Sequence, residues 1–182
     1  MKMTKTQKMA ITAVFLAMAL LLPQVFHVFP IPNTGNVFLP MHIPVILCGY
    51  IVGPVYGLVL GAVSPILSFL LTGMPNTARL PFMICELAAY GLTAGLTYNH
   101  LFCKGNKTIR VYASLILTMI CGRVAYFIGL VIAIYLLHME NLTVGAVMSA
   151  VVLGLPGIII QFIFIPAIIF AIDKLINQGQ VV

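Results

Sequence analysis

The stretch FLPMHIPVILCGYIVGP, residues 38–54, decides how this chain is divided into helices. It is apolar enough for a membrane, yet it carries three prolines and two glycines. It opens an apolar block, residues 43–72, that is longer than the ~20 residues one membrane span needs. Proline removes a backbone donor and restricts the residue before it, so the block is expected to break at Gly53-Pro54. We therefore predict a short helix at 43–53 and a full-length helix at 55–72.

The composition indicates an integral membrane protein. The chain has 182 residues, of which 62% are hydrophobic and 7% charged, and its mean hydropathy is +1.17. A soluble domain of this size needs far more charge to cover its surface. The formal charge of +6 comes from cations at the flanks of apolar runs and forms no continuous basic patch, so it does not indicate nucleic-acid binding. We expect one compact domain, residues 1–182.

Charge distribution sets the number of spans. The first apolar run continues to Phe29, which predicts a retained helix rather than a cleaved signal peptide. With six spans, seven of the nine basic residues face the cytoplasm, whereas five spans would place the cations of the 101–108 loop outside. We predict an all-α membrane protein with six transmembrane helices, N-in and C-in, with a short second helix. The predicted spans are 9–29, 43–53, 55–72, 80–100, 109–137 and 145–172.

Charged and polar residues within the apolar segments form the candidate site. Glu86 follows Arg79 by seven residues, on nearly the same helical face and about 10 Å deeper. Arg123 is predicted near mid-membrane, and ionised groups at that depth face a partner or a wet cavity. One interpretation is a Glu86–Arg123 ion pair that only fixes helix packing. The other is a polar cavity open to the outside, capped by the loop 30–42, with Gln161 at the depth of Arg123.

Aromatic and histidine residues extend this set. Tyr90 lies one turn past Glu86, and Tyr126 lies three residues past Arg123. His42 opens the short second span, where an interfacial or capping role competes with substrate contact. An arginine in such a cavity suits a carboxylate or a phosphate, because its planar fork pairs with two oxygens.

Several functions are disfavoured by missing motifs. The four histidines are scattered without the spacing of a zinc site, and KGNKT at 104–108 lacks the phosphate-loop pattern. No Ser-His-Asp set is evident, so we expect neither an enzyme nor a bound metal or cofactor. A small membrane enzyme with a Glu86/Arg123 site and a purely structural membrane protein remain the alternatives of other classes.

Small residues recur at spacings that bring helices together. GYIVG, GLVLG and GLTAG, at residues 49–53, 57–61 and 91–95, each place two glycines four apart. Such faces let helix backbones approach closely in lipid, and we expect these three to pack within the chain. Ala10, Ala13 and Ala17 share one face of the first helix, which indicates a surface for a partner subunit.

The whole chain resembles one family of transport proteins. The features that carry the resemblance are six spans in under 200 residues, the long outer loop, AVFLA at 13–17, FLPMHIPVILCGYIVGPVYGLVLG at 38–61 and GMPNTARLPFMICELAAYGLTAGL at 73–96. In these it resembles the substrate-binding S component of energy-coupling factor (ECF) vitamin transporters. The resemblance implies a multi-pass protein of the bacterial plasma membrane that binds a vitamin from outside. It also implies docking, through Ala13 and Ala17, onto a transmembrane coupling subunit driven by two cytoplasmic ATPases.

The resemblance also implies where the substrate binds. The family's site lies toward the outer side, walled by the first and third outer loops and spans four to six. On this chain that location indicates Asn36, His42, Asn76, Arg79, Glu86, Tyr90, Arg123, Tyr126 and Gln161. The sequence is most similar to pantothenate subunits, and Arg79 or Arg123 could pair with that carboxylate. Pyridoxine and hydroxymethylpyrimidine are the alternatives, although the absence of Trp removes one strong stacking platform.

Overall fold

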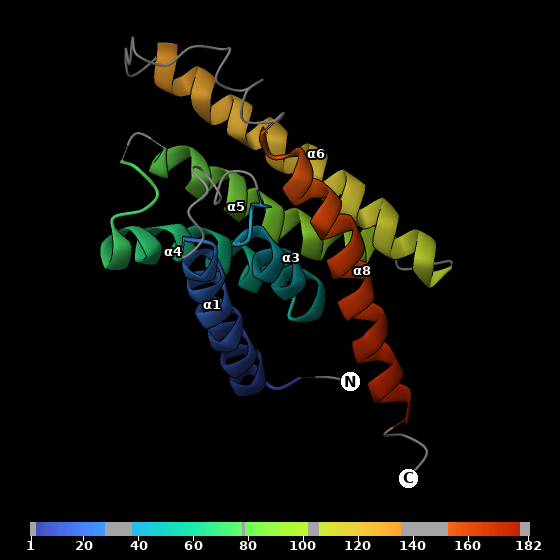
Figure 1. The fold of residues 1–182 in the computed structure, drawn as a ribbon. Helices are drawn as coiled ribbons and strands as arrows, with labels where there is room; N and C mark the ends of the chain where they lie inside the picture. The colour runs from blue at the N-terminus through green and yellow to red at the C-terminus, as the bar shows by residue number, and fades with distance from the viewer. Residues whose placement is uncertain (1–2, 28–37, 78, 102–105, 136–152, 179–182) are drawn as a thin grey trace.

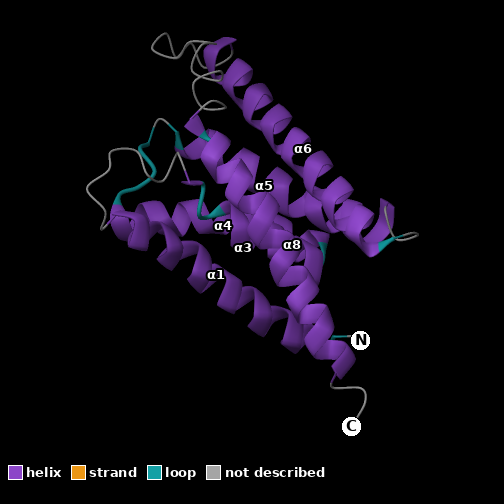
Figure 2. Ribbon diagram, turned by 45° about the vertical axis from the view of Figure 1, so that its right-hand side comes forward, coloured by secondary structure: helices purple, strands orange, loops and turns teal. Residues whose placement is uncertain are grey.

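The computed structural model describes residues 3–27, 38–77, 79–101, 106–135 and 153–178. These segments form helices joined by turns, and no strand occurs among them (Figures 1 and 2). The all-α expectation is confirmed for this part of the chain.

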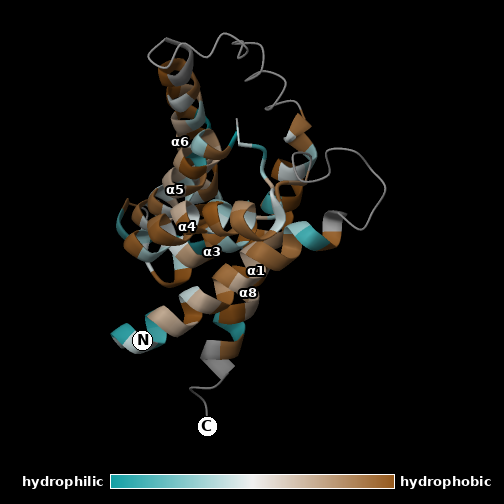
Figure 3. Ribbon diagram, turned by 90° about the vertical axis from the view of Figure 1, so that its left-hand side faces the viewer, coloured by the Kyte–Doolittle hydropathy of each residue, from teal (hydrophilic) through white to brown (hydrophobic). Residues whose placement is uncertain are grey.

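Five of the described helices are long and apolar enough to cross a membrane. They are α1 (Lys5–His27), α4 (Pro54–Thr72), α5 (Leu80–Leu96), α6 (Lys107–Tyr135) and α8 (Leu155–Gln178). A π-helical turn, η1 (Thr97–Leu101), continues α5. Hydrophobic residues predominate along these helices (Figure 3). Many of their large apolar side chains are exposed, which suits a surface solvated by lipid.

The short helix α3 (His42–Ile51) lies inside the bundle. Eight of its ten residues are buried, and α3 contacts α1, α4, α5 and α8. At 1.5 Å per residue, ten residues reach only about 15 Å, roughly half of a bilayer core. From the sequence we expected this helix to cross only with a thinned bilayer or with help from the extended segment before it. The structure instead surrounds it with protein, and the count of six spans stays a prediction.

The break between α3 and α4 lies where the sequence predicts it. Helix α3 ends at Ile51 and α4 begins at Pro54, whose missing N–H costs nothing in the first turn of a helix. Gly53 has a φ of 125°, a backbone conformation that L side chains rarely adopt. The chain can therefore reverse direction within two residues.

Glycines allow α3, α4 and α5 to touch through their backbones. A Cβ on Gly57 would meet the carbonyl oxygen of Gly91, and a Cβ on Gly91 would meet that of Gly57. A Cβ on Gly49 would also meet Gly91, and Gly95 lies against Pro54 in the same way. The predicted packing role is confirmed at Gly49, Gly57, Gly91 and Gly95, whereas Gly53 lies beyond the end of α3 and has no atom within 4 Å of a Cβ built on it. The contact fixes α5 against α3 and α4 and thereby positions Glu86.

The helix ends that carry cations gather at one side of the molecule. The start of α1 and the end of α8 point the same way in all three ribbon views (Figures 1, 2 and 3). An ion pair between Lys107 and Asp173 ties the start of α6 to the last part of α8. Lys8 lies over the Tyr56 ring, 5.7 Å from its centroid, at the start of α4. The predicted N-in, C-in orientation would place this side in the cytoplasm, and that orientation stays a prediction.

Helix ends differ from the predicted spans where polar residues flank apolar ones. Helix α1 begins at Lys5 rather than residue 9, and α8 continues to Gln178 rather than ending at 172. Hydropathy marks the part of a helix that lies in lipid, whereas backbone hydrogen bonds continue into the polar flanks. Of the predicted sixth span, residues 145–152 lie outside the described residues.

Candidate functional site

An ion pair joins α5 and α6 within the bundle. Nη1 of Arg123 lies 2.9 Å from Oε1 of Glu86, and the two side chains are 18% and 6% exposed. The alignment is not that of a hydrogen bond, because Glu86 Oε1 has no hydrogen-bond partner of acceptable geometry. Two charges at this depth are costly unless they are paired. The pairing that the sequence analysis considered is present.

His42 on α3 and Tyr90 on α5 adjoin the pair. His42 Nε2 lies 3.8 Å from Glu86 Oε1, too far for a hydrogen bond. The His42 ring meets the Tyr90 ring edge-on, with 5.0 Å between centroids. A Cβ on Gly122 would strike the Tyr90 ring, so glycine makes room for the tyrosine. His42 was expected at the mouth of the site, whereas it is 1% exposed in the core.

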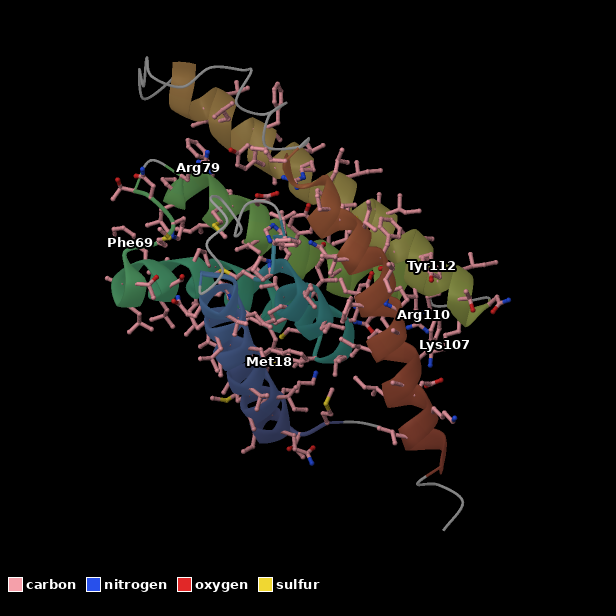
Figure 4. All side chains as sticks on the ribbon, in the orientation of Figure 1. Met18, Phe69, Arg79, Lys107, Arg110 and Tyr112 are labelled. Carbon is pink, nitrogen blue, oxygen red and sulfur yellow. The ribbon has the colours of Figure 1, made fainter. Side chains whose placement is uncertain are left out.

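Aromatic rings lie on the outer side of the pair. Phe82 precedes Glu86 by one turn, and its ring meets the Tyr126 ring edge-on at 6.0 Å between centroids. Tyr126 interacts electrostatically with Glu86, Arg79 and Arg123. Arg79 itself is exposed and forms the N-cap of α5, at the end of that helix labelled in Figure 4. The structure thus leaves the Arg79 side chain at the surface, at the start of the helix that carries Glu86.

Buried polar atoms without a partner surround the pair. Among the described residues they include both ring nitrogens of His42, Nε and Nη2 of Arg123 and Oε1 of Glu86. A buried donor or acceptor left unsatisfied costs about 1–3 kcal/mol. A cluster of such atoms is typical of a site whose partner is a ligand, because a packing pair gains nothing from open donors.

Gln161 lies on α8 and is 1% exposed. Its side-chain nitrogen Nε2 has no hydrogen-bond partner. The next residue, Phe162, stacks on Tyr112 at 6.5 Å between ring centroids, and Tyr112 precedes Arg123 by eleven positions. This part of α8 therefore lies nearer the inner half of α6 than the depth of Arg123 at which we expected it. Helix α8 crosses α6 rather than running beside it, which explains the difference (Figure 1).

The loop residues of the predicted site stand apart from this cluster. Asn36 lies outside the described residues. Asn76 is exposed, and its carbonyl oxygen accepts the N–H groups of Arg79 and Leu80. It therefore shapes the turn that precedes α5 in the described structure.

The three alanines of the predicted docking face are all exposed. Ala10, Ala13 and Ala17 lie on α1, which packs through its other side on α3 and α4. Val14 and Met18 flank them and are 61% and 37% exposed. The face is small and apolar, as the spacing predicts.

A second polar layer, between η1 and the first half of α6, was missed from the sequence. The Thr97 hydroxyl lies 2.5 Å from that of Ser114 and 3.5 Å from that of Thr118. Arg110 Nε donates to the Tyr98 carbonyl at 2.8 Å, and its guanidinium lies 4.1 Å from the centre of the Tyr98 ring. Ser114 and Thr118 are four apart, which was an available signal for a shared helical face. No pattern in the sequence predicted the π-helical turn that presents the Tyr98 carbonyl to Arg110.

Comparison with known protein families shows which family this chain belongs to. The model of the family described as "ECF transporter, substrate-specific component" matches residues 7–172, nearly the whole chain. The chain belongs to this family. A substrate-specific component is a transport subunit and not an enzyme, and its role is to bind the substrate for vitamin-type uptake. Comparison with curated proteins and with solved structures found no match. The family membership confirms the resemblance and leaves the identity of the vitamin to be derived from the site.

Proposed function

We propose that this substrate-specific component binds a vitamin with high affinity for an ATP-driven ECF uptake transporter, and that the vitamin is pantothenate. The observation that carries the proposal is the buried Glu86–Arg123 pair surrounded by polar atoms without partners. In a protein whose family role is substrate binding, such atoms are candidates for the substrate's own hydrogen bonds.

The buried polar atoms without hydrogen-bond partners suit a ligand that is polar along its length. Arg123 offers two open donor nitrogens, Glu86 Oε1 is an acceptor, and both ring nitrogens of His42 are open. Pantothenate carries hydroxyls, an amide and a carboxylate, so it can satisfy donors and acceptors together. Each buried group that it satisfies removes a penalty of about 1–3 kcal/mol.

The aromatic residues at the site favour a ligand without a ring. The Tyr90 ring is 1% exposed, because Gly122 lies against it and His42 meets it edge-on. Phe82 is 4% exposed and is engaged with Tyr126. With these faces occupied and no Trp in the chain, little stacking surface remains for a pyridine or a pyrimidine.

Pyridoxine and hydroxymethylpyrimidine remain the alternative ligands, because Glu86 Oε1 could accept hydrogen bonds from their rings or hydroxyls. Alternatives of another class give the Glu86–Arg123 pair a different purpose. A small membrane enzyme would turn over substrate without partners. A structural protein would keep all of its activity when both residues are replaced by a hydrophobic pair.

The proposed partners are a transmembrane coupling subunit and two cytoplasmic ATPases, in the bacterial plasma membrane. The exposed Ala10, Ala13 and Ala17 face supports docking, because small residues let a partner helix approach closely. The substrate-binding subunit would then depend on its partners for the energy of transport.

The deciding experiment is to purify the protein alone and titrate pantothenate, pyridoxine and hydroxymethylpyrimidine by calorimetry. Mass spectrometry of the small molecules that co-purify gives an independent identification. We expect pantothenate to bind most tightly. Absence of binding to all three by folded protein would refute the proposal, and tightest binding of a ring compound would replace the ligand but not the role.

A further inference from the structure

We propose that one edge of Arg123, formed by Nε and Nη2, is the subsite for a planar two-oxygen anion of the substrate, a carboxylate. Glu86 holds the remaining nitrogen, Nη1, and acts as a positioning residue rather than as a contact for that anion. The inference rests on the proposed function, because it concerns the substrate of the same site.

The geometry of the Arg123 guanidinium is the first argument for a carboxylate. A guanidinium presents its donors in a rigid planar fork, and the Nε–H and one Nη2–H point the same way. In this protein Nη1 is engaged 2.9 Å from Glu86 Oε1, whereas Nε and Nη2 are both buried and without a partner. Two parallel donors on one edge match the two oxygens of a carboxylate. A single carbonyl or hydroxyl oxygen would leave one of the two donors unsatisfied.

The net charge around Arg123 is the second argument for an anionic group on the substrate. Arg79 and Arg123 both act electrostatically on Tyr126, and Glu86 is the one acid that does so. Two cations and one anion leave one positive charge, with the titratable rings of His42, Tyr90 and Tyr126 facing the same region. Asp173, the other acid in the described part of the chain, is paired with Lys107 at the opposite end. A bound carboxylate would bring the formal charge of the site to zero.

The structure also separates the roles of the two arginines. Arg79 is exposed at the start of α5, where water competes for its hydrogen bonds. The Arg123 side chain is 18% exposed, and its two open nitrogens are fully covered. Arg79 is thus placed to attract an anion toward the outer end of the bundle, and Arg123 to hold it.

The test uses two ligands that differ only in the group at issue. Calorimetry compares pantothenate with pantothenyl alcohol, in which a hydroxymethyl group replaces the carboxylate. Wild-type protein should bind the alcohol about 10- to 100-fold more weakly, the factor expected for losing a charge-assisted hydrogen bond. Arg123→Lys keeps the charge beside Glu86 but removes the fork, so it should reduce this preference at least about tenfold.

Two further variants separate positioning from general damage. Glu86→Gln should weaken pantothenate more than pantothenyl alcohol, because it loosens the orientation of the guanidinium. A merely structural loss would weaken both ligands alike. Lys174→Gln, which removes one exposed cation at the inner end of α8, should change neither affinity.

The outcomes distinguish the two proposals. Equal binding of acid and alcohol by wild-type protein, or an unchanged preference in Arg123→Lys, would overturn the carboxylate subsite while pantothenate binding stands. Binding of a ring compound but not of pantothenate would also overturn it and leave the transport role intact. Failure of folded protein to bind any of these compounds would overturn the proposed function and this inference with it.

Discussion

A double-mutant cycle on Glu86 and Arg123 measures what the buried pair contributes to the fold. At a separation of 2.9 Å between Nη1 and Oε1, Coulomb's law with an effective dielectric constant of about 20 gives roughly 6 kcal/mol. Relaxation of the unpaired charge toward His42 or water lowers the measurable part. Couplings measured between close charge pairs are about 1.5–7 kcal/mol, and we expect about 2–4 kcal/mol here. Glu86→Gln and Arg123→Gln should each destabilise the protein, and the double variant should cost less than their sum.

The assay follows burial of a thiol, because the chain contains no Trp to report on unfolding. Cys48 is fully buried on α3, so its alkylation rate reports opening of the core. The background replaces the other three cysteines with serine: Cys85, Cys103 and Cys121. Unfolding is driven by sodium dodecyl sulfate in mixed micelles, and each variant's midpoint is converted to a free energy. A coupling energy below about 0.5 kcal/mol, the usual error of additivity, would refute the reasoning.

Three further predictions concern packing, docking and the inner polar layer. Gly91→Ala should destabilise the protein by about 1–3 kcal/mol through overpacking against α4. The control Gly129→Ala should be tolerated, because its added Cβ would lie 3.5 Å from the nearest atom. Equal thermal stabilities of the two variants would contradict this prediction. Ala13→Trp should abolish co-purification with the coupling subunit but spare ligand binding, and Ile128→Trp on the exposed face of α6 serves as its control. Arg110→Gln should lower stability by about 1 kcal/mol through loss of the cation–ring contact and leave pantothenate affinity unchanged, as calorimetry would show.

Local chemistry explains the parts of the fold that the sequence predicts well. The break at Gly53-Pro54 follows from the backbone properties of those two residues alone. The glycines spaced four apart lie on one helical face whatever surrounds them, so their packing role could be predicted without a structure. The Glu86–Arg123 pair was predictable for a similar reason, because two isolated charges of opposite sign in apolar helices have few other partners.

Tertiary geometry explains the parts of the fold that the sequence does not predict. His42 begins a helix, which indicated a boundary position, but α3 lies so deep in the bundle that its first residue is buried. The depth of Gln161 depends on the angle at which α8 crosses α6, and counting residues along a helix cannot supply that angle. Arg110 contacts a carbonyl that only the π-helical turn after α5 presents. Each of these depends on contacts between segments far apart in the chain.

The buried position of α3 has a consequence for how the protein is made. Helices can enter a membrane one by one only when each is stable in lipid on its own. The ten residues of α3 are too few to form such an independently stable span. Helix α3 is therefore expected to enter the bilayer as a hairpin with α4, joined by the tight turn at Gly53. It gains a stable environment only when α5 has been synthesised and closes over it. Ribosomes halted before residue 96 should consequently hold an immature intermediate in which Cys48 is still open to alkylation.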